Sequence, residues 1–455
     1  MSSKYAAYPE YKDSGVNFLN QVPISWEFKK VNYLFSFGRG LNITKADLED
    51  NGIPVVNYGE VHSKYGFEVN PDIHDLRKVN ERYLKTTPSA LLNAGDFVFA
   101  DTSEDLEGAG NFTQYVGSVP LFAGYHTVVL RPYDGNVPRY LAYAFESSEC
   151  RSQIRLAVKG VKVFSITQGI LKDLMLPIPS WEEQQKIAVF LDYETARIDR
   201  LIEKQQRLIE LLKEKRQAVI SHAVTKGLNP DAPMKDSGVE WLGQVPEHWS
   251  IAKLSYRYEV LLGKMLDEKK ITGEFLGRYL RNTDVQWGKI NTFNLPVMDF
   301  RPTEVDRYTV KKGDLIVCEG GEIGRSAIWL NDEPCFYQKA LHRLRPYCSK
   351  QDLSSFMFYV MFDAVHQERF SGGISKATIA HLPAETFRQY RFAYPPYSEQ
   401  VAIVEYLEKM GNKFDNLELA VRSQVELLKE RRSALISAAV TGKIDVRGWT
   451  KPQEG

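Results

Sequence analysis

The sequence lacks the features that mark membrane-spanning, secreted or disulfide-rich proteins. It contains no run of about eighteen apolar residues, so no helix is expected to span a membrane. The first ten residues lack the apolar stretch of a signal peptide. The four cysteines form no Cys-x-x-Cys pair, which favours reduced, structural cysteines and a cytoplasmic location.

Residues for catalysis are also scarce. The sequence has no Gly-x-x-x-x-Gly-Lys-(Ser/Thr) phosphate loop, and its eight histidines show no zinc-binding spacing. Neither Pro71-Asp72 nor Pro230-Asp231 is followed by the acidic-x-Lys pattern of a metal-dependent nuclease. These absences predict a chain that is not an enzyme and that holds no metal.

One proline motif resembles an enzyme signature. Tyr394-Pro395-Pro396-Tyr397 resembles the (Asn/Asp/Ser)-Pro-Pro-aromatic motif of DNA amino-methyltransferases. In that motif the first side chain accepts a hydrogen bond from the target amine, which a tyrosine does poorly. No glycine-rich cofactor loop precedes it, and Pro177-Ile178-Pro179 stands at the matching place in the first half. We therefore interpret both motifs as proline stops before a helix.

Charge gives no direct indication of a nucleic-acid partner. The chain carries 58 basic and 58 acidic residues, so its formal net charge is zero. Any DNA-binding surface must therefore be local. With 455 residues the chain is too long for one core, and a size of about 150 residues per domain suggests about three units.

An internal duplication organises the chain. Residues 12–26, KDSGVNFLNQVPISW, return as residues 235–249, KDSGVEWLGQVPEHW, with ten of fifteen positions identical. Residues 210–225 return as residues 426–441, with twelve of sixteen positions identical. Each half therefore contains a leading motif, a globular block and a long helix, whereas the two globular blocks diverge strongly in sequence.

The two helical segments show the spacing of a coiled coil. Steps of four and three residues from Ile187 and from Ile403 are mostly apolar over more than four heptads, with charged residues between them. An amphipathic helix that lies on its own domain is the alternative interpretation. The predicted seam of the first helix holds Ile187, Leu191, Glu194, Ile198, Leu201, Gln205, Leu208, Leu212, Lys215 and Val219, and the second holds the residues 216 positions later.

The globular blocks indicate mixed α and β structure. Residues 96–100, 126–130 and 314–318 are β-rich runs, and residues 140–147 and 354–364 suggest short helices. We predict an α+β protein in which a long antiparallel two-helix coiled coil separates two mixed α/β domains as a pseudo-twofold repeat. The predicted boundaries are residues 1–179 and 229–395 for the domains, and 180–228 and 396–445 for the helices, with a tail to 455.

Several local patches could contact DNA. Residues 151–172 contain no acid, and Arg151, Arg155 and Lys159 would form one positive face if helical. Residues 336–350 also lack acids, and residues 278–282 offer guanidinium and amide groups for base contacts. Residues 320–324 could contact a phosphate or form a strand-to-strand turn. The candidate DNA-binding residues are Asn57, Tyr58, His62, Lys64, Arg151, Arg155, Lys159, Lys162, Arg278, Arg281, Asn282, Lys289, Arg325, Gln338, Lys339, Arg343 and Lys376.

Taken together, these features resemble the HsdS family, the specificity subunits of type I restriction–modification systems. The resemblance covers nearly the whole chain, and its carriers are the leading motifs that end in Trp26 and Trp249, the Glu-Gln pairs at 183–184 and 399–400, and the repeated helix motif. It implies two target-recognition domains on double-stranded DNA. It also implies two methyltransferase subunits that carry S-adenosylmethionine, further motor–nuclease subunits, and no cofactor in this chain.

A physical reason for a split DNA site follows from the helices. A helix from about Trp181 to Lys226 would be roughly 69 Å long at ~1.5 Å per residue, so each domain would read one half-site and the DNA between would go unread. Two alternatives remain open, a DNA adenine methyltransferase with its own cofactor and a coiled-coil scaffold that does not bind DNA.

Overall fold

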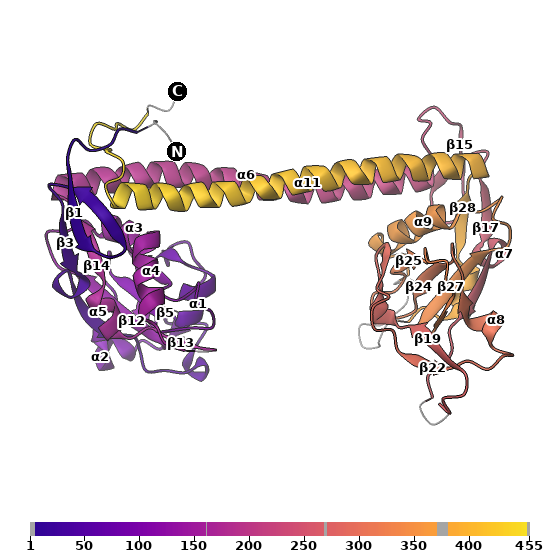
Figure 1. Cartoon of the computed structure of the whole chain (residues 1–455), viewed down its shortest axis with the longest axis horizontal. Coiled ribbons are helices and arrows are strands. Elements are labelled where there is room, and N and C mark those ends of the chain that lie inside the picture. Colours follow the sequence, from indigo (N-terminus) through magenta and orange to yellow (C-terminus); the bar gives the residue numbers. More distant parts are fainter. Residues whose placement is uncertain (1–4, 161, 268–270, 371–380, 453–455) are drawn as a thin grey trace. The chain divides into compact units, whose positions relative to one another are not determined.

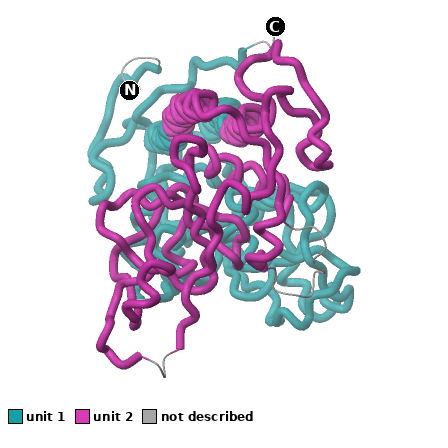
Figure 2. The backbone as a smooth tube through the Cα atoms, turned by 90° about the vertical axis from the view of Figure 1, so that its right-hand side faces the viewer, with its two compact units in different colours: residues 1–206, 423–455 teal, residues 207–422 magenta. Residues whose placement is uncertain are grey.

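The computed structural model describes residues 5–160, 162–267, 271–370 and 381–452. The chain forms two compact units, which are coloured separately in Figure 2. Unit 1 comprises residues 1–206 and 423–455, and unit 2 comprises residues 207–422. Both ends of the chain therefore belong to unit 1. No helix of the described residues is both long enough and apolar enough to cross a membrane.

Unit 1 is built on a five-stranded and a three-stranded sheet with short helices around them (Figure 1). The larger sheet has the order β4 (Phe35–Arg39), β12 (Thr127–Pro132), β8 (Phe97–Ala100), β10 (Phe112–Tyr115), β6 (Phe67–Val69), and the smaller has β11 (Phe122–Ala123), β5 (Ile53–Val56), β7 (Lys78–Val79). Three strand pairs complete it: β1 (Tyr11–Val16) with β2 (Leu19–Pro23), β3 (Glu27–Lys30) with β14 (Met175–Ile178), and β9 (Thr102–Ser103) with β13 (Phe164–Ser165). Its short helices are α1 (Tyr58–Ser63), α2 (Tyr83–Thr86), α3 (Pro138–Glu146), α4 (Ser148–Ala157) and α5 (Gln168–Asp173).

Unit 2 has a related plan with two four-stranded sheets. Their orders are β18 (Tyr258–Leu262), β27 (Leu341–Pro346), β24 (Leu315–Cys318), β25 (Ser326–Ile328), and β22 (Val297–Asp299), β19 (Leu276–Leu280), β26 (Cys335–Tyr337), β23 (Thr309–Val310). The strand pairs are β15 (Met234–Asp236) with β16 (Gln244–Pro246), β17 (Ser250–Lys253) with β28 (Arg391–Tyr394), and β20 (Val285–Gln286) with β21 (Lys289–Ile290). Its short helices are α7 (Leu254–Arg257), α8 (Val305–Tyr308), α9 (Ser354–His366) and α10 (Ala384–Gln389).

Backbone hydrogen bonds show that the duplication continues through the centres that diverge in sequence. The amide of Gly40 donates to Thr127 O at 3.2 Å, and the amide of Gly263 donates to Leu341 O at 3.0 Å. The side chain of Gln184 bonds the amide of Val137 at 2.9 Å, and that of Gln400 bonds the amide of Leu353 at 2.9 Å. Both units therefore share one framework, held by matched backbone bonds and by a repeated glutamine side chain.

Two long helices follow the proline stops, as predicted. α6 (Trp181–Lys226) has 46 residues and begins two residues after Pro179, and α11 (Tyr397–Val440) has 44 and begins directly after Pro396. In unit 1 the core contains Ile187 of α6 together with Leu435 of α11. In unit 2 the core contains Ile220 of α6 together with Ile403 of α11. Each unit thus encloses the start of one long helix and the end of the other.

The seam of these helices departs from the predicted register. Leu201 and Leu208 are 41% and 40% exposed, whereas Ile202 and Ile209 are half-buried. In α11 the predicted seam residues Leu417, Gln424 and Arg431 are likewise exposed. The residues one position later, 418, 425 and 432, are more buried. The predicted seam is wrong at these positions and at Lys215. After Ile198 the next seam position lies four residues later instead of three, so the later seam positions shift by one residue.

The shorter predicted elements are confirmed. The β-rich runs correspond to β8, β12 and β24, and the two short helices correspond to α3 and α9. Residues 320–324 lie between β24 and β25, so they form the strand-to-strand turn. Arg151 and Arg155 lie on α4, but that helix ends at Ala157. The single positive helix face predicted to include Lys159 is therefore wrong.

Candidate nucleic-acid interface

In unit 1, three turns that are far apart in sequence meet beside one end of β12. We define turn cluster 1 as Asn57, Tyr58, Asp101, Tyr125 and His126. The amide of Tyr58 donates to Tyr125 O at 3.3 Å, and the amide of Asp101 donates to His126 O at 3.1 Å. The amide of Tyr125 donates to Asn57 Oδ1 at 3.3 Å. These bonds fix the end of β5, the end of β8 and the β11–β12 turn against one another.

The side chains of turn cluster 1 offer a mixed polar and aromatic surface. The Tyr58 ring lies 5.8 Å from the Tyr125 ring and 5.6 Å from the His126 ring, both edge to face. His126 Nδ1 lies 3.3 Å from Asp101 Oδ1, and the His126 side chain is 60% exposed. Burial raises the pKa of Tyr125, so its hydroxyl stays protonated at neutral pH. Imidazole, carboxylate and phenol groups are suited to hydrogen bonds with base edges.

Within turn cluster 1, Asn57 has a structural role. It is fully buried and caps α1, because its side chain accepts from the amide of Glu60 while the Glu60 carboxylate accepts from the amide of Asn57. Its Nδ2 has no hydrogen-bond partner among the described residues. Asn57 therefore positions the start of α1 and the Tyr125 backbone, and the structure contradicts its prediction as an exposed DNA contact.

Unit 2 builds the equivalent site from different side chains. We define turn cluster 2 as Arg281, Asn282, Glu319, Lys339 and Ala340. The amide of Glu319 donates to Ala340 O at 2.9 Å, which matches the bond from Asp101 to His126. Asn282 Nδ2 donates to Gly320 O at 2.8 Å. The Lys339 side chain is exposed, and its amide donates to Lys264 O at 2.7 Å.

Two arginines frame turn cluster 2. The Arg281 guanidinium pairs with both carboxylate oxygens of Asp284 at 2.8 and 2.9 Å, and this hydrogen bonding raises the pKa of Arg281. Arg325 Nη2 donates to Asn282 Oδ1 at 2.8 Å. Asp284 is buried and Arg281 is partly exposed, so the pair holds one edge of a guanidinium and leaves the rest accessible.

The two clusters share an unusual backbone feature. His126 and Ala340 each stand directly before the central strand, β12 or β27, and have φ values of 57° and 97°. Positive φ is rare for residues other than glycine, and such conformations gather at functional sites. Further out, the amide of Ile166 donates to Asp101 O and that of Leu382 to Glu319 O, both at 2.8 Å. The scaffold is therefore the same, whereas the exposed side chains differ.

The structure brings together some predicted residues and separates others. Tyr58 lies in turn cluster 1, and Arg281, Asn282 and Lys339 lie in turn cluster 2 with Arg325 and Gln338 beside them. Exposed candidates elsewhere are Lys64, Arg155, Lys159, Lys162, Arg278 and Lys289. Lys376 lies outside the described residues.

Three candidates have structural partners instead. Arg343 is 1% exposed, forms an ion pair with Glu259 and donates to Thr309 O at 2.6 Å. Its predicted base contact is wrong, because β27 lies between β18 and β24 and is buried on both faces from Leu341 to Leu344, so this side chain lies inside the domain. Arg151 is half-buried, pairs with Glu146 at 2.9 Å and bonds Asn111, which in turn contacts His62 at 3.2 Å. This series of contacts fixes α4 to α1 and argues against base contacts from Arg151 and from His62.

Sequence reasoning missed Asp101, Tyr125 and His126. No local pattern distinguishes them, since their proximity depends on strand pairing between segments 25 to 70 residues apart. The positive φ of His126 also has no sequence signal, because glycine would be the usual residue there. Among the described residues, no group of three or more His, Cys, Asp or Glu side chains is arranged to hold a metal ion.

Comparisons with known proteins agree with this architecture. The family described as the type I restriction modification DNA specificity domain matches residues 23–212 and 266–427. The putative type I restriction enzyme MjaX specificity subunit of Methanocaldococcus jannaschii is 23% identical over 94% of this chain and 96% of its own. The EcoKI specificity subunit of Escherichia coli K12 is 21% identical over 93% and 90%.

Two solved structures resemble the fold. A chain from a study of complex assembly and conformational transition of the type I restriction–modification system has a TM-score of 0.69 at 15% identity, covering 93% of this chain and 99% of its own. The HsdS subunit of Thermoanaerobacter tengcongensis has a TM-score of 0.55 at 16% identity, covering 93% and 98%.

Proposed function

The chain belongs to the family of type I restriction–modification DNA specificity subunits, and we propose that it reads a bipartite, asymmetric DNA target with its two turn clusters. Each cluster would read one half-site. The chain would act as a non-catalytic subunit that directs methyltransferase subunits, together with motor–nuclease restriction subunits, to that target. In this proposal two methyltransferase copies bind, and S-adenosylmethionine is bound by them rather than by this chain.

One observation carries the proposal. The same backbone bonds, from Asp101 to His126 and from Glu319 to Ala340, hold clusters whose exposed side chains differ. A protein that reads two different half-sites needs a constant scaffold and variable reading groups. A coiled-coil scaffold that does not bind DNA would not need that combination.

The chemistry of each cluster suits direct readout. Turn cluster 2 offers the free edge of the Arg281 guanidinium and the exposed ammonium group of Lys339, which favour the acceptors of guanine, whereas the Asn282 amide is held by Gly320 and Arg325. Turn cluster 1 offers an imidazole, a carboxylate and a phenol, so it can also accept hydrogen bonds, for example from the cytosine amine. The two half-sites should therefore differ in sequence.

Exchange of one block tests the proposal. Residues 250–392 would be replaced by the matching block of a family relative, and the chain would be expressed with its methyltransferase subunit in a host that lacks other adenine methylation. We expect methylome mapping to show a new second half-site, an unchanged first half-site and a similar spacer. A change in both half-sites, or in neither, would refute two independent readers. The reciprocal swap of residues 27–176 is the matched control.

A further inference from the structure

One turn of the shared framework carries different side chains in the two units. In unit 1 the amide of Asn57 donates to Glu60 Oε2 at 3.0 Å, and in unit 2 the amide of Arg281 donates to Asp284 Oδ2 at 2.8 Å. Each turn directly follows a strand, β5 or β19, that has a parallel neighbour, β11 or β26. Arg281 therefore stands where unit 1 has the buried Asn57.

A buried carboxylate holds the Arg281 guanidinium in one orientation. The two carboxylate oxygens of Asp284 accept from Nε and Nη2 of Arg281 at 2.9 and 2.8 Å. The same carboxylate accepts from the Arg281 amide, so one buried group fixes both the backbone and the side chain. The Arg281 side chain is 41% exposed. Among the described residues Nη1 makes no hydrogen bond, so the edge formed by Nη1 and Nη2 is accessible.

The donor pattern of this edge matches one base. Nη1 and the second N–H of Nη2 present two neighbouring donors in a fixed plane. In the major groove guanine presents two neighbouring acceptors, O6 and N7, whereas adenine offers an acceptor beside a donor and the pyrimidines offer no such pair. Because Asp284 already restricts the rotamers of Arg281, less side-chain entropy is lost when the contact forms. The held edge therefore favours guanine.

The charges of turn cluster 2 favour a base contact for Arg281 over a phosphate contact. The Asp284 carboxylate balances the charge of Arg281, and a phosphate is bound mainly through net positive charge. Lys339 is exposed and forms no ion pair among the described residues, so its charge is available to a phosphate. The two cations of the cluster thus suit different parts of DNA.

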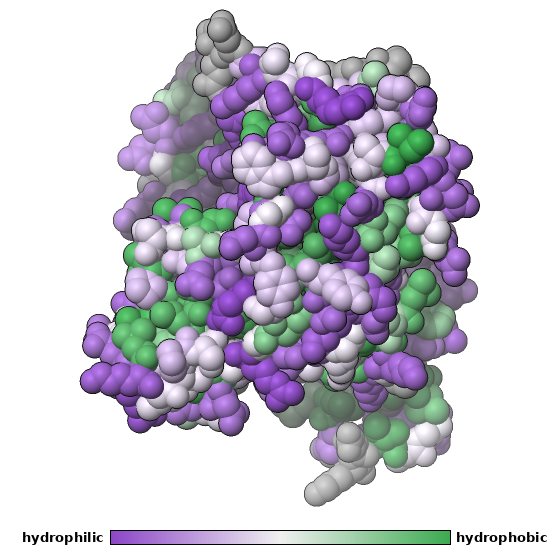
Figure 3. Space-filling view, turned by 90° about the vertical axis from the view of Figure 1, so that its left-hand side faces the viewer, coloured by the Kyte–Doolittle hydropathy of each residue, from purple (hydrophilic) through white to green (hydrophobic). Residues whose placement is uncertain are grey.

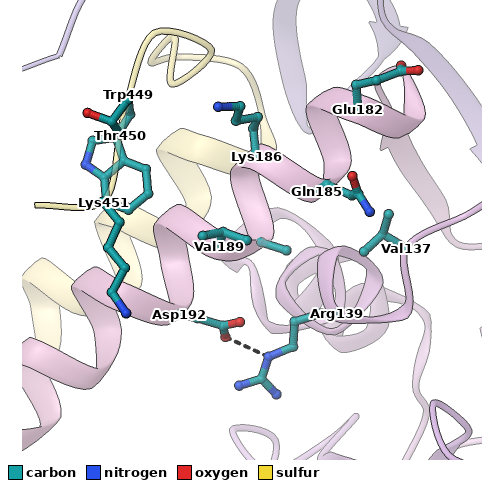
Figure 4. A pocket seen from close by; sticks show the side chains of 11 residues that line it. Val137, Arg139, Glu182, Gln185, Lys186, Val189, Asp192, Trp449, Thr450 and Lys451 are labelled. Carbon is teal, nitrogen blue, oxygen red and sulfur yellow. Dashed lines mark hydrogen bonds and ion pairs between the residues drawn. The ribbon is translucent and has the colours of Figure 1, made fainter. Parts of the chain in front are cut away.

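Arg139 of unit 1 shows how a guanidinium without a free edge is arranged (Figure 4). Its Nε pairs with Asp192 and its Nη1 with Glu68, both at 2.7 Å, and the guanidinium lies 4.7 Å from the centre of the Phe67 ring. On the face of unit 1 that Figure 3 shows, hydrophilic side chains are spread among small hydrophobic groups, so polarity alone does not mark a reading group. A single buried carboxylate behind an exposed guanidinium distinguishes Arg281 from Arg139.

We infer that Arg281 contacts one guanine of the second half-site in the major groove, and that Asp284 is the positioning residue that holds the guanidinium for this contact. The inference rests on the proposed function and assigns one base to one side chain within it. Because Asn57 occupies the equivalent place in unit 1, this contact is made only in the half-site that unit 2 reads.

Base analogues test the contact in the full chain, assembled with its methyltransferase subunit. Methylome mapping gives the target, and the block swap identifies the half-site of unit 2. Competition binding then compares target duplexes in which each guanine of that half-site is replaced by 7-deazaguanine, which lacks N7, or by inosine, which lacks only the minor-groove amine. We expect one guanine at which 7-deazaguanine weakens binding about tenfold and inosine leaves it nearly unchanged. A half-site without a G·C pair would overturn the inference.

Matched variants assign this guanine to Arg281. Arg281→Ala should bind the guanine and 7-deazaguanine duplexes alike, and its preference for G·C over A·T at this position should fall by about 10- to 100-fold. Asp284→Asn should lose part of the preference, whereas Asp284→Glu, which has the carboxylate of Glu60 in unit 1, should keep more of it. Lys339→Ala is the control, because it should weaken binding to all duplexes alike and reduce the salt dependence by about one phosphate.

Thermal unfolding of each variant alone separates recognition from folding. If Arg281→Ala does not fold, Arg281→Lys takes its place, since lysine keeps the charge but cannot present the planar pair of donors. A folded variant that keeps the full guanine preference would overturn the inference. So would one that weakens binding to all duplexes alike with a smaller salt dependence, because Arg281 would then contact a phosphate. The block swap tests half-site reading separately, so failure of the proposed function would be recognised there.

Discussion

Arg216 Nη1 lies 2.6 Å from Asp415 Oδ1, and the same ion pair is repeated with the helices exchanged. In unit 2, α6 supplies the arginine and α11 the aspartate. In unit 1, Arg432 of α11 pairs with Asp199 of α6 at 2.9 Å. Each residue of the second pair stands 216 positions from its equivalent in the first. Antiparallel pairing of two repeated helices in a fixed register produces this exchange.

Charge reversal should reveal this register. We expect Arg216→Glu to destabilise unit 2 by at most about 1 kcal/mol, because both partners are partly exposed and solvent screens them. The double variant Arg216→Glu/Asp415→Arg should recover most of that loss in thermal unfolding. The matched control reverses the charges of Arg216 and of Asp199, whose partner is Arg432 in unit 1. It should give no recovery of stability.

The buried arginine of unit 2 should matter for stability rather than for readout. Arg343→Ala leaves an unfilled space and an unpaired Glu259, so we expect a loss on the order of 3 kcal/mol in urea unfolding. Glu259 is 40% exposed and can rehydrate, which keeps the loss below that of a fully buried pair. At temperatures where the variant is folded, the methylated sequence should stay unchanged. A new base preference in this half-site would contradict the structural role.

The sequence predicted the helices better than it predicted the site. Proline stops and apolar spacing were sufficient to place α6 from Trp181 to Lys226. The seam failed at Leu201 and Leu208, because leucine satisfies an apolar template whether it is buried or exposed. The repeat in the divergent centres was not visible, since backbone amides and carbonyls maintain it and they carry no sequence signal.

Acid should destabilise unit 2 through His342. Burial lowers the pKa of His342 to about 4, and its Nε2 donates to Leu382 O at 2.8 Å. In the unfolded chain its pKa is about 6.5, so the unfolded state gains the proton first as the pH falls. The stability from neutral His342 is therefore present above pH 6.5 and is lost between about pH 6.5 and 4, by up to roughly 3 kcal/mol.

Unfolding measured across this pH range would test the assignment. His342→Val introduces the residue type that unit 1 has at the equivalent position, Val128, and should flatten this part of the stability profile. The variant loses the bond to Leu382 O, so its stability at pH 7 should be lower. An acid-dependent loss of unchanged size in the variant would assign the effect to another group.

The helices should set the spacer between half-sites. Seven residues inserted in each helix, after Gln206 and after Arg422, preserve the buried face and add about 10 Å, or roughly three base pairs. We expect methylome mapping to show a longer spacer between the same half-sites. Insertion of seven residues in α6 alone breaks the register with α11 and should abolish methylation. Altered half-sites at the old spacing would disprove a spacing role.

His126 of turn cluster 1 should contribute to base recognition but not to folding stability. His126 has a φ of 57°, which glycine adopts at no steric cost, so His126→Gly should fold with unchanged or higher stability. It removes the imidazole that contacts Asp101, so we expect relaxed preference at one position of the first half-site, worth about 1–3 kcal/mol. Ala340→Gly is the matched control, because Ala340 has a φ of 97° but no polar side chain. Competition binding by the assembled methyltransferase should show relaxation in the first variant only. Equal relaxation in both would mean that the turn backbone, and not the His126 side chain, determines the preference.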